Sequence, residues 1–240
     1  MSAIIVGNAI VAAVVLVIAG RLYGKWLTLR RAEFIRTFRW PPGLLARLQK
    51  HHPGFERKDS ALVSRGLRQF FLAYLMSGKR YVSMPSQVAD DLWHEFILYT
   101  REYDAFCRHA FGGFLHHTPA VVLSEHRRSN EGLRRVWWYC CKYENIDPVK
   151  PTRLPLLFAL DSKFKIAEGF VYHPDCEELR KNGSGTAYCG GDFSDSSVDG
   201  SSDGFGDGDA GHGGGSGGDG GGSDGGSGGD GGGGCGGGGD

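Results

Sequence analysis

A carboxylate and an imidazole that together could bind a metal ion lie close to each other in the sequence. Asp90 and Asp91 are followed shortly by His94. Residues three or four positions apart are neighbours on a helix, so either aspartate can lie beside the His94 imidazole. Carboxylates and imidazoles are common ligands of transition metals, and they also form acid–base pairs.

A second histidine could complete this site from beyond the helix. Gly112-Gly113 predicts the end of the helix, and His116-His117 follows shortly afterwards. A turn at the glycines would bring one of these histidines back toward His94. We therefore predict a metal site formed by Asp91, His94 and His117, because zinc and ferrous iron both accept two imidazoles and a carboxylate. The same groups could instead act as an acid–base pair without a metal, or form a structural hydrogen-bond network.

The competing interpretation of this cluster is that it is the solvated face of a helix. A polar stripe on an otherwise apolar helix usually faces water, and an aspartate near a helix start favours the helix dipole without any function. The segment D-L-W-H-E is not the zinc motif H-E-x-x-H, because no histidine follows four residues after His94. Motifs for phosphate-binding loops, dinucleotide binding, nucleophile elbows and kinases are also missing from the sequence.

The apolar pattern predicts a helical scaffold for these residues. From Pro85-Ser86 to Gly112-Gly113, apolar residues recur at steps of three and four on two adjacent faces, which predicts the central helix of a bundle. Cys107 on its apolar side is predicted to be a small core residue rather than a nucleophile. Sustained strand-like alternation is missing, so we predict an all-α fold, an irregular helical bundle, with at most a minor hairpin late in the domain. Further helices are predicted at residues 43–51, 56–77, 119–127 and 131–144.

The first residues of the chain predict a transmembrane helix. Residues 1–20 contain no charged residue and are mostly Ile, Val and Ala, and roughly 20 apolar residues are needed to cross a bilayer. A cleaved signal peptide is the alternative, with Val17-Ile18-Ala19 as a weak cleavage site. Signal peptides carry their positive charges before the apolar run, however, and here the charges follow it. The anchor is therefore the favoured interpretation.

The residues after this span predict its orientation. Residues 21–50 contain eight Lys and Arg residues and one acid, so the positive-inside rule predicts a single-pass protein with its N-terminus outside and its body in the cytoplasm. Residues 21–40 are predicted to form a basic amphipathic helix along the inner membrane surface. The predicted membrane-interface residues are Arg21, Tyr23, Lys25, Trp26, Arg30 and Arg31.

Charge divides the rest of the chain into a helical domain, residues 41–182, and a tail, residues 183–240. All 27 Lys and Arg residues precede the tail, which holds ten Asp and 29 of the 40 Gly residues. Such a composition predicts disorder, because too little apolar surface is available to offset the loss of chain entropy. A calcium-binding β-roll is excluded, since the tail lacks a regular apolar position. The predicted partners are the lipid bilayer and a protein or the acidic tail itself, while nucleic acid is disfavoured because the basic residues cluster beside the span.

The chain around the candidate site resembles the glycine-rich domain-containing protein family. This resemblance covers residues 80–160, and the glycine-rich tail fits the family's name. It implies that Asp91, His94 and His117 matter but gives them no role. RNA binding does not carry over from the plant members, because the aromatic RNA-recognition pattern is missing. The residues that carry the resemblance are Val88, Asp91, Trp93-His94, Thr100, Tyr103, Phe106-Cys107, Phe111-Gly112, Phe114, His116-His117 and Leu154–Asp161.

Two functions from different classes follow from these observations. The first expectation is an interaction or scaffold module held at the cytoplasmic surface of the membrane, with the tail as a flexible acidic arm. The alternative is a metal-dependent or acid–base enzyme that uses Asp91, His94 and His117. The sequence itself names no substrate for the second class.

Overall fold

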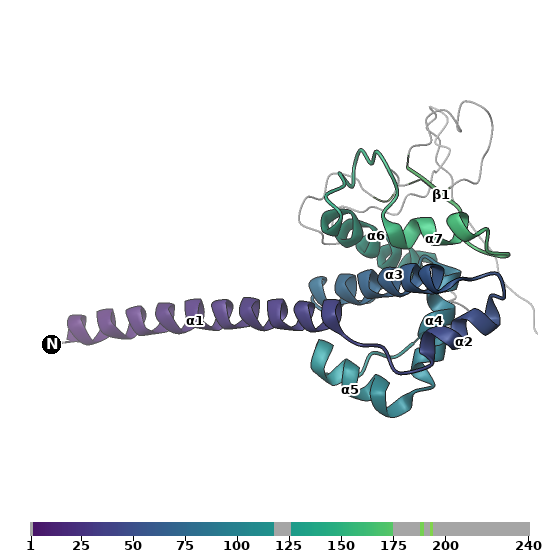
Figure 1. Ribbon diagram of the computed structural model, residues 1–240. Coiled ribbons are helices and arrows are strands. Elements are labelled where there is room, and N and C mark those ends of the chain that lie inside the picture. Colours follow the sequence, from purple (N-terminus) through teal and green to yellow (C-terminus); the bar gives the residue numbers. More distant parts are fainter. Residues whose placement is uncertain (1, 118–125, 175–187, 190–192, 194–240) are drawn as a thin grey trace, which may run out of the picture. The chain divides into compact units, whose positions relative to one another are not determined.

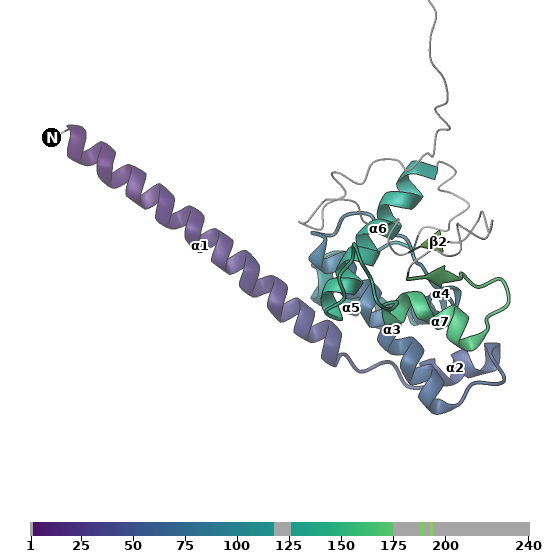
Figure 2. The ribbon, with the colours of Figure 1, turned by 90° about the horizontal axis from the view of Figure 1, so that it is seen from above.

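The computed structural model describes residues 2–117, 126–174, 188, 189 and 193 of the chain. These residues form seven helices and one pair of two-residue strands, which confirms the predicted all-α fold. The strands β1 (Tyr172–His173) and β2 (Tyr188–Cys189) pair in parallel, so they are not the hairpin that the sequence allowed (Figures 1 and 2). Most of the predicted helix at 119–127 and residues 194–240 of the predicted disordered tail lie outside the described residues.

Helix α1 (Ser2–Thr37) is one continuous helix (Figure 1). Its segment Gly7–Thr37 is long and apolar enough to span a membrane, and an 18-residue stretch of it has a mean hydropathy of 1.7. The predicted amphipathic helix over 21–40 continues from the span without a break after residue 20, as the second half of α1, and ends at Thr37. Ala32 and Ile35 near its end are buried against α3 (Arg57–Met76) and α5 (Thr100–Phe111). These apolar side chains therefore meet protein rather than the membrane surface.

Helix α3 is the centre of the domain. It contacts α1, α2 (Leu44–His51), α4 (Gln87–Ile97), α6 (His126–Tyr143) and α7 (Leu156–Phe164), and Figure 1 shows α6 and α7 on the opposite side of α3 from α2 and α4. The close approach of α7 depends on Gly66 of α3, where a Cβ would lie 2.5 Å from Leu160 Cδ1. The aromatic side chains that meet around α3 form the core, including Phe70, Phe71, Trp93, Phe96, Phe106 and Phe111.

The predicted central helix is two helices, α4 and α5, with a break at Tyr99. The backbone leaves helical geometry there, with φ −83° and ψ 63°, and the Tyr99 hydroxyl donates a 3.1 Å hydrogen bond to the Pro42 carbonyl. In an unbroken helix, residues as far apart as Phe96 and Phe106 would be separated by about 15 Å along the axis. Here their ring centroids lie 5.4 Å apart. The break therefore folds both helices onto one core, which buries the two apolar faces that a single helix would have left partly exposed.

The start of α4 is fixed by a carboxylate of α7. Asp161 is buried, and it accepts hydrogen bonds from the Ser86 hydroxyl at 2.7 Å and from the backbone N–H groups of Gln87 and Val88 at 2.7 and 3.2 Å. The same carboxylate accepts a 2.9 Å hydrogen bond from the Phe170 N–H. The bonds from Gln87 and Val88 satisfy backbone donors at the helix start that have no partner within the helix. Because α4 carries the candidate site, Asp161 holds that site in place.

The domain reaches further along the chain than residue 182, where the sequence predicted its end. Phe193 is buried among Trp137, Phe158 and Tyr172, with ring centroids 5.6, 6.0 and 5.9 Å away. Glycine-rich surroundings led the sequence prediction to place this residue in the tail. One aromatic ring, however, contributes a large apolar area even where its neighbours contribute none.

Candidate metal centre

Asp90 and His94 of α4 and His117 beyond α5 come together in one polar cluster. Each residue offers one ligand atom, and these atoms all lie within 4.8 Å of one another. His117 Nε2 is 2.9 Å from Asp90 Oδ1, and His94 Nε2 is 3.8 Å from Asp90 Oδ2. The two imidazole rings lie 4.3 Å apart by their centroids. Two imidazoles and a carboxylate therefore face a common point.

The spacing of this cluster is close to that of a transition-metal site. In a tetrahedral zinc site, ligand atoms about 2.1 Å from the metal lie about 3.4 Å from one another. Small side-chain rotations would bring Asp90, His94 and His117 to such distances from their present separation of up to 4.8 Å. The His94 side chain is 51% exposed, whereas Asp90 and His117 are 20% and 14% exposed. Solvent therefore reaches the cluster from the His94 side.

The carboxylate beside the two histidines is Asp90 and not Asp91, which the sequence analysis favoured. Asp91 Oδ2 lies 2.9 Å from His52 Nε2, and its Oδ1 accepts a 3.1 Å hydrogen bond from Gln87 Nε2. Successive residues on a helix are rotated by about 100°, so adjacent aspartates face different neighbours. Asp91 faces α2, while Asp90 faces His117 and lies one turn before His94. The helical spacing relative to His94 fits both aspartates equally well. Only the position of α2 shows which aspartate faces His94 and His117.

The return of the chain after α5 depends on Gly112. Its φ of +76° lies in the left-handed region, and a Cβ there would be 2.5 Å from Arg31 Nη2 of α1. The left-handed backbone conformation therefore favours glycine, whereas the Arg31 guanidinium, at the end of a flexible side chain, could move aside. Of the two candidate histidines beyond this turn, the structure brings His117 to the cluster. His116 is exposed, and its ring lies 4.7 Å from that of Phe114.

Two aromatic residues position His117. The Tyr103 hydroxyl donates a 2.5 Å hydrogen bond to the Leu115 carbonyl and accepts one of 3.1 Å from Trp93 Nε1. Burial raises the pKa of Tyr103, so its hydroxyl stays protonated and remains a donor. The Trp93 ring also meets the His117 ring edge-on, with centroids 4.6 Å apart. The sequence analysis gave neither aromatic residue a role at the site, although a buried Tyr or Trp usually needs a polar partner.

The third acidic residue of this part of α4, Glu95, is already paired with α2. Its carboxylate accepts hydrogen bonds from Arg47 Nε and from His51 Nε2, the second at 2.8 Å. Burial raises the pKa of Glu95, but the hydrogen bonds from Arg47 and His51 outweigh burial and hold the pKa below its ordinary value. Glu95 is therefore ionised and engaged, which leaves Asp90 as the carboxylate that faces the two histidines.

The thiol of Cys107 is not part of this site. Cys107 is buried in the core, and burial raises its pKa, which disfavours the reactive thiolate. The sequence prediction of a core residue is confirmed. Cys140 and Cys141 of α6 are also buried, and burial raises the pKa of both thiols.

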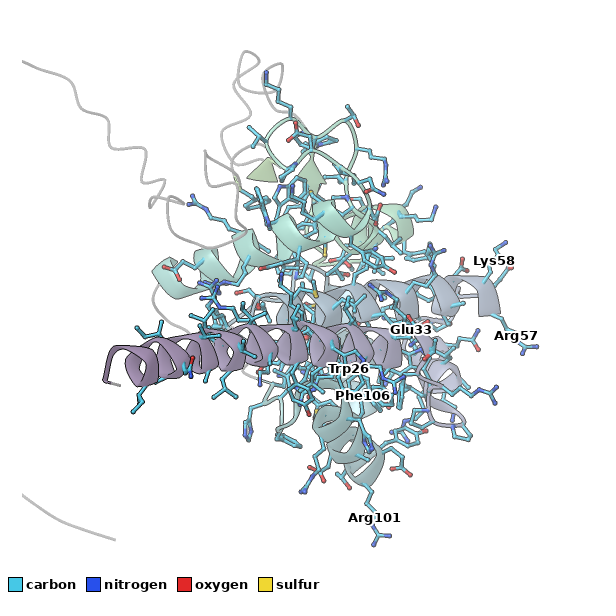
Figure 3. All side chains as sticks on the ribbon, turned by 90° about the vertical axis from the view of Figure 1, so that its left-hand side faces the viewer. Trp26, Glu33, Arg57, Lys58, Arg101 and Phe106 are labelled. Atoms are coloured by element: carbon cyan, nitrogen blue, oxygen red, sulfur yellow. The ribbon has the colours of Figure 1, made fainter. Side chains whose placement is uncertain are left out.

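The residues predicted at the membrane interface fall into two groups. Arg21 and Lys25 are exposed, and so are Tyr23 and Trp26, whose stacked rings lie 5.8 Å apart. The Arg30 guanidinium lies 5.2 Å from the centroid of the Trp26 ring, which is labelled on α1 in Figure 3. The predicted interface residue Arg31 is instead half-buried against Gly112 of the domain. Arg31 therefore belongs to the packing between α1 and the chain after α5.

Comparison with known proteins gives one family. The model of the UCP032817-like family matches residues 30–193. This match contains Asp90, His94, His117 and Phe193, and it begins after the most apolar part of α1. No curated protein and no solved structure matches the chain.

Proposed function

We propose a function for this chain, which belongs to the UCP032817-like family, from the geometry of its candidate metal centre. The domain binds a divalent transition metal, zinc or ferrous iron, through Asp90, His94 and His117. The observation that carries the proposal is the convergence of three ligand atoms within 4.8 Å from two separate parts of the chain. His117 is brought there by the Gly112 turn and the Tyr103 hydrogen bond, so helical spacing alone does not account for the cluster.

The ligand set supports an enzyme more than a structural metal site. Structural zinc sites usually have four protein ligands, whereas catalytic sites keep a position open for water or substrate. Asp90, His94 and His117 supply three, and the 51% exposed side chain of His94 leaves the cluster open to solvent. A metal bound there would lower the pKa of a coordinated water to about 7 and would polarise a substrate oxygen. The proposed class is therefore metal-dependent chemistry on a ligand that arrives from solvent.

A membrane location is the second part of the proposal. Helix α1 anchors the chain with its N-terminus outside and its body in the cytoplasm. Two observations support this: the apolar helix Gly7–Thr37 and the eight basic residues in 21–50. The exposed side chains Arg21, Tyr23, Lys25 and Trp26 suit the lipid headgroup layer. The proposed metal centre would then act near the inner membrane surface.

Metal analysis of the full chain in detergent tests the proposed function. We expect close to one equivalent of zinc or iron in the purified protein, and binding of Co²⁺ to the metal-free protein with the absorption bands of a low-symmetry site. His94→Ala, His117→Ala and Asp90→Asn should each lose the metal and the Co²⁺ bands. Absence of both signals in the unmodified chain would contradict the proposal.

Two matched control variants make this test specific. His116→Ala removes the exposed histidine next to His117, and Asp91→Asn removes the carboxylate next to Asp90. Both variants should keep the metal and the Co²⁺ spectrum. Loss of metal in Asp91→Asn together with retention in Asp90→Asn would mean that the other aspartate is the ligand, and the proposed site would then be wrong.

A further inference from the structure

A second polar site lies where side chains of α1, α3 and α6 meet. It is a cavity of about 240 Å³. Three of its side chains carry guanidinium groups, and none of the described residues that line it is acidic. The lining residues are Arg36 of α1, Arg65, Arg68, Gln69 and Leu72 of α3, and Tyr143 of α6.

Arg68 is the fixed cation of this cavity. Its two terminal nitrogens donate hydrogen bonds of 2.6 Å to the carbonyls of Ile35 and Phe38, at the end of α1. The guanidinium also lies 4.7 Å from the centroid of the Trp40 ring. Burial lowers the pKa of Arg68, which means that water solvates its charge poorly. A poorly solvated cation held in one place favours a nearby anion.

The other two arginines leave positive charge uncompensated. Arg36 Nη1 lies 3.6 Å from the exposed carboxylate of Glu33, and its guanidinium lies 5.8 Å from the centroid of the Tyr143 ring. Arg65 is exposed and makes no hydrogen bond or ion pair within the described part of the chain. The partly buried carboxylate of Glu144, which follows Tyr143 in the chain, already accepts hydrogen bonds from Gln69, Arg153 and the Leu156 N–H. Of the three guanidinium groups, only that of Arg36 has a carboxylate partner in the described part of the chain, and that carboxylate is exposed.

We propose that this cavity binds a phosphoryl group. Planar guanidinium groups match the oxygens of phosphate in pairs, and three of them around one space suit a multiply charged oxyanion. The volume of about 240 Å³ is smaller than the usual range for ligands of drug size, so the bound group is small. Leu72 and the Tyr143 ring supply an apolar wall for a short organic part next to the phosphate.

The phosphoryl group could come from a lipid headgroup or from a small soluble molecule, and geometry favours the soluble source. A helix rises about 1.5 Å per residue, so Arg36 lies about 24 Å beyond Gly20, where the predicted span ends. The headgroup layer on one side of a bilayer is only about 5–8 Å deep. This step uses the proposed span of α1, whereas the phosphoryl chemistry does not depend on the span or on the metal centre.

Calorimetric titration of the full chain with inorganic phosphate, at constant ionic strength, tests this site. In nanodiscs of phosphatidylcholine we expect saturable binding of one phosphate. Arg36→Gln combined with Arg65→Gln should weaken this binding at least about tenfold, because two charge-assisted contacts are removed. Arg57→Gln is the matched control, since Arg57 lies on the same helix as Arg65 and points outward in Figure 3. The control should bind phosphate as the unmodified chain does.

A second titration separates the two sources. In nanodiscs that contain phosphatidic acid, inorganic phosphate should bind as strongly as before if the natural ligand is soluble. Loss of phosphate binding there, with binding retained in phosphatidylcholine nanodiscs, would assign the cavity to a headgroup and overturn the soluble source. Absence of phosphate binding in both kinds of nanodisc, or equal weakening in Arg57→Gln, would overturn the site itself.

Discussion

The hydroxyl of Tyr103 is bonded to the carbonyl of Leu115 at 2.5 Å, and Leu115 lies two residues before His117. This bond ties the chain after Gly112 to the first turn of α5. Trp93, one residue before His94, donates to the same hydroxyl at 3.1 Å. A single buried phenol therefore connects the helix that carries Asp90 and His94 with the turn that carries His117.

The substitution Tyr103→Phe should weaken the connection between α4, which carries Asp90 and His94, and the turn that carries His117. The substitution keeps the ring but leaves Trp93 Nε1 and the Leu115 carbonyl without their partner, which should cost about 1–3 kcal/mol of unfolding free energy. Residues that orient metal ligands typically change metal affinity by about 10–100-fold, so Co²⁺ affinity should fall within that range. Denaturant unfolding and Co²⁺ titration measure the two effects. Tyr23→Phe, which makes the same change at an exposed position of α1, is the control and should leave Co²⁺ affinity unchanged.

Glu144 should make the stability of the domain sensitive to acid. Burial raises its pKa, but hydrogen bonds from the Leu156 N–H, Arg153 and Gln69 hold the pKa below the ordinary value of 4.5. A carboxylate with a lowered pKa in the folded state contributes stability above its unfolded pKa and loses it as the pH falls through the folded pKa. The free energy of unfolding should therefore fall as the pH is lowered from about 6 to about 3.

The variant Glu144→Gln measures how much of the pH dependence of the unfolding free energy comes from Glu144. It should be less stable than the unmodified chain at neutral pH, with a smaller change in unfolding free energy between neutral and acidic pH. Glu102→Gln, on the exposed first turn of α5, provides the comparison and should follow the unmodified chain. Parallel pH curves for Glu144→Gln and the unmodified chain would contradict the role assigned to Glu144.

The end of the folded domain can be located by truncation. A chain that ends at Phe193 should melt at nearly the temperature of the full chain, because residues 194–240 are mostly Gly, Asp and Ser. A chain that ends at residue 182 loses Phe193 and β2, and should melt well below the melting temperature of the full chain. Phe193→Ala should cost about 3–5 kcal/mol, as for other buried phenylalanines. Phe205→Ala makes the same change within the glycine-rich segment and should have no effect on the melting temperature.

Topology is open to a direct test. A reporter that works only in the cytoplasm should be active when fused after Asp240, and a reporter that works only outside should be silent. Replacing Arg21, Lys25 and Arg30 with Gln should give a mixed orientation, because the positive-inside bias is weakened. Activity of the outside reporter in the unmodified chain, or a mature N-terminus near Gly20, would rule out the proposed anchor.

The sequence predicted those parts of the fold that depend only on residues close together in the chain. Gly112 as a helix end and the burial of Cys107 were both readable, since each depends on a few neighbouring residues. The break at Tyr99 was not, because apolar spacing continues through it and only contact with Pro42 and the shared core decides the bend. Phe193 was missed for the same reason, since its partners lie in three distant elements.

The sequence predicted the ligand types of the candidate site, a carboxylate and two histidines, but not which aspartate supplies the carboxylate. Helical spacing from His94 fits Asp90 and Asp91 alike. The choice depends on which of them faces the end of α2, where His52 pairs with Asp91. The arginine-lined cavity gave no signal, because Arg36 and Arg65 come from helices whose relative placement the sequence does not specify. The resemblance to glycine-rich domain-containing proteins stays a prediction, since the family match does not test it.

Helix α1 has no loop between its apolar part and the buried residues Ala32 and Ile35. In a membrane-anchored chain, such a continuous helix fixes both the rotation of the domain about the helix axis and its distance from the membrane. Each residue added or removed between Trp26 and Ala32 would turn the domain by about 100° around the helix axis and shift it by about 1.5 Å. The number of residues in this stretch therefore sets the direction, around the axis of α1, in which His94 faces.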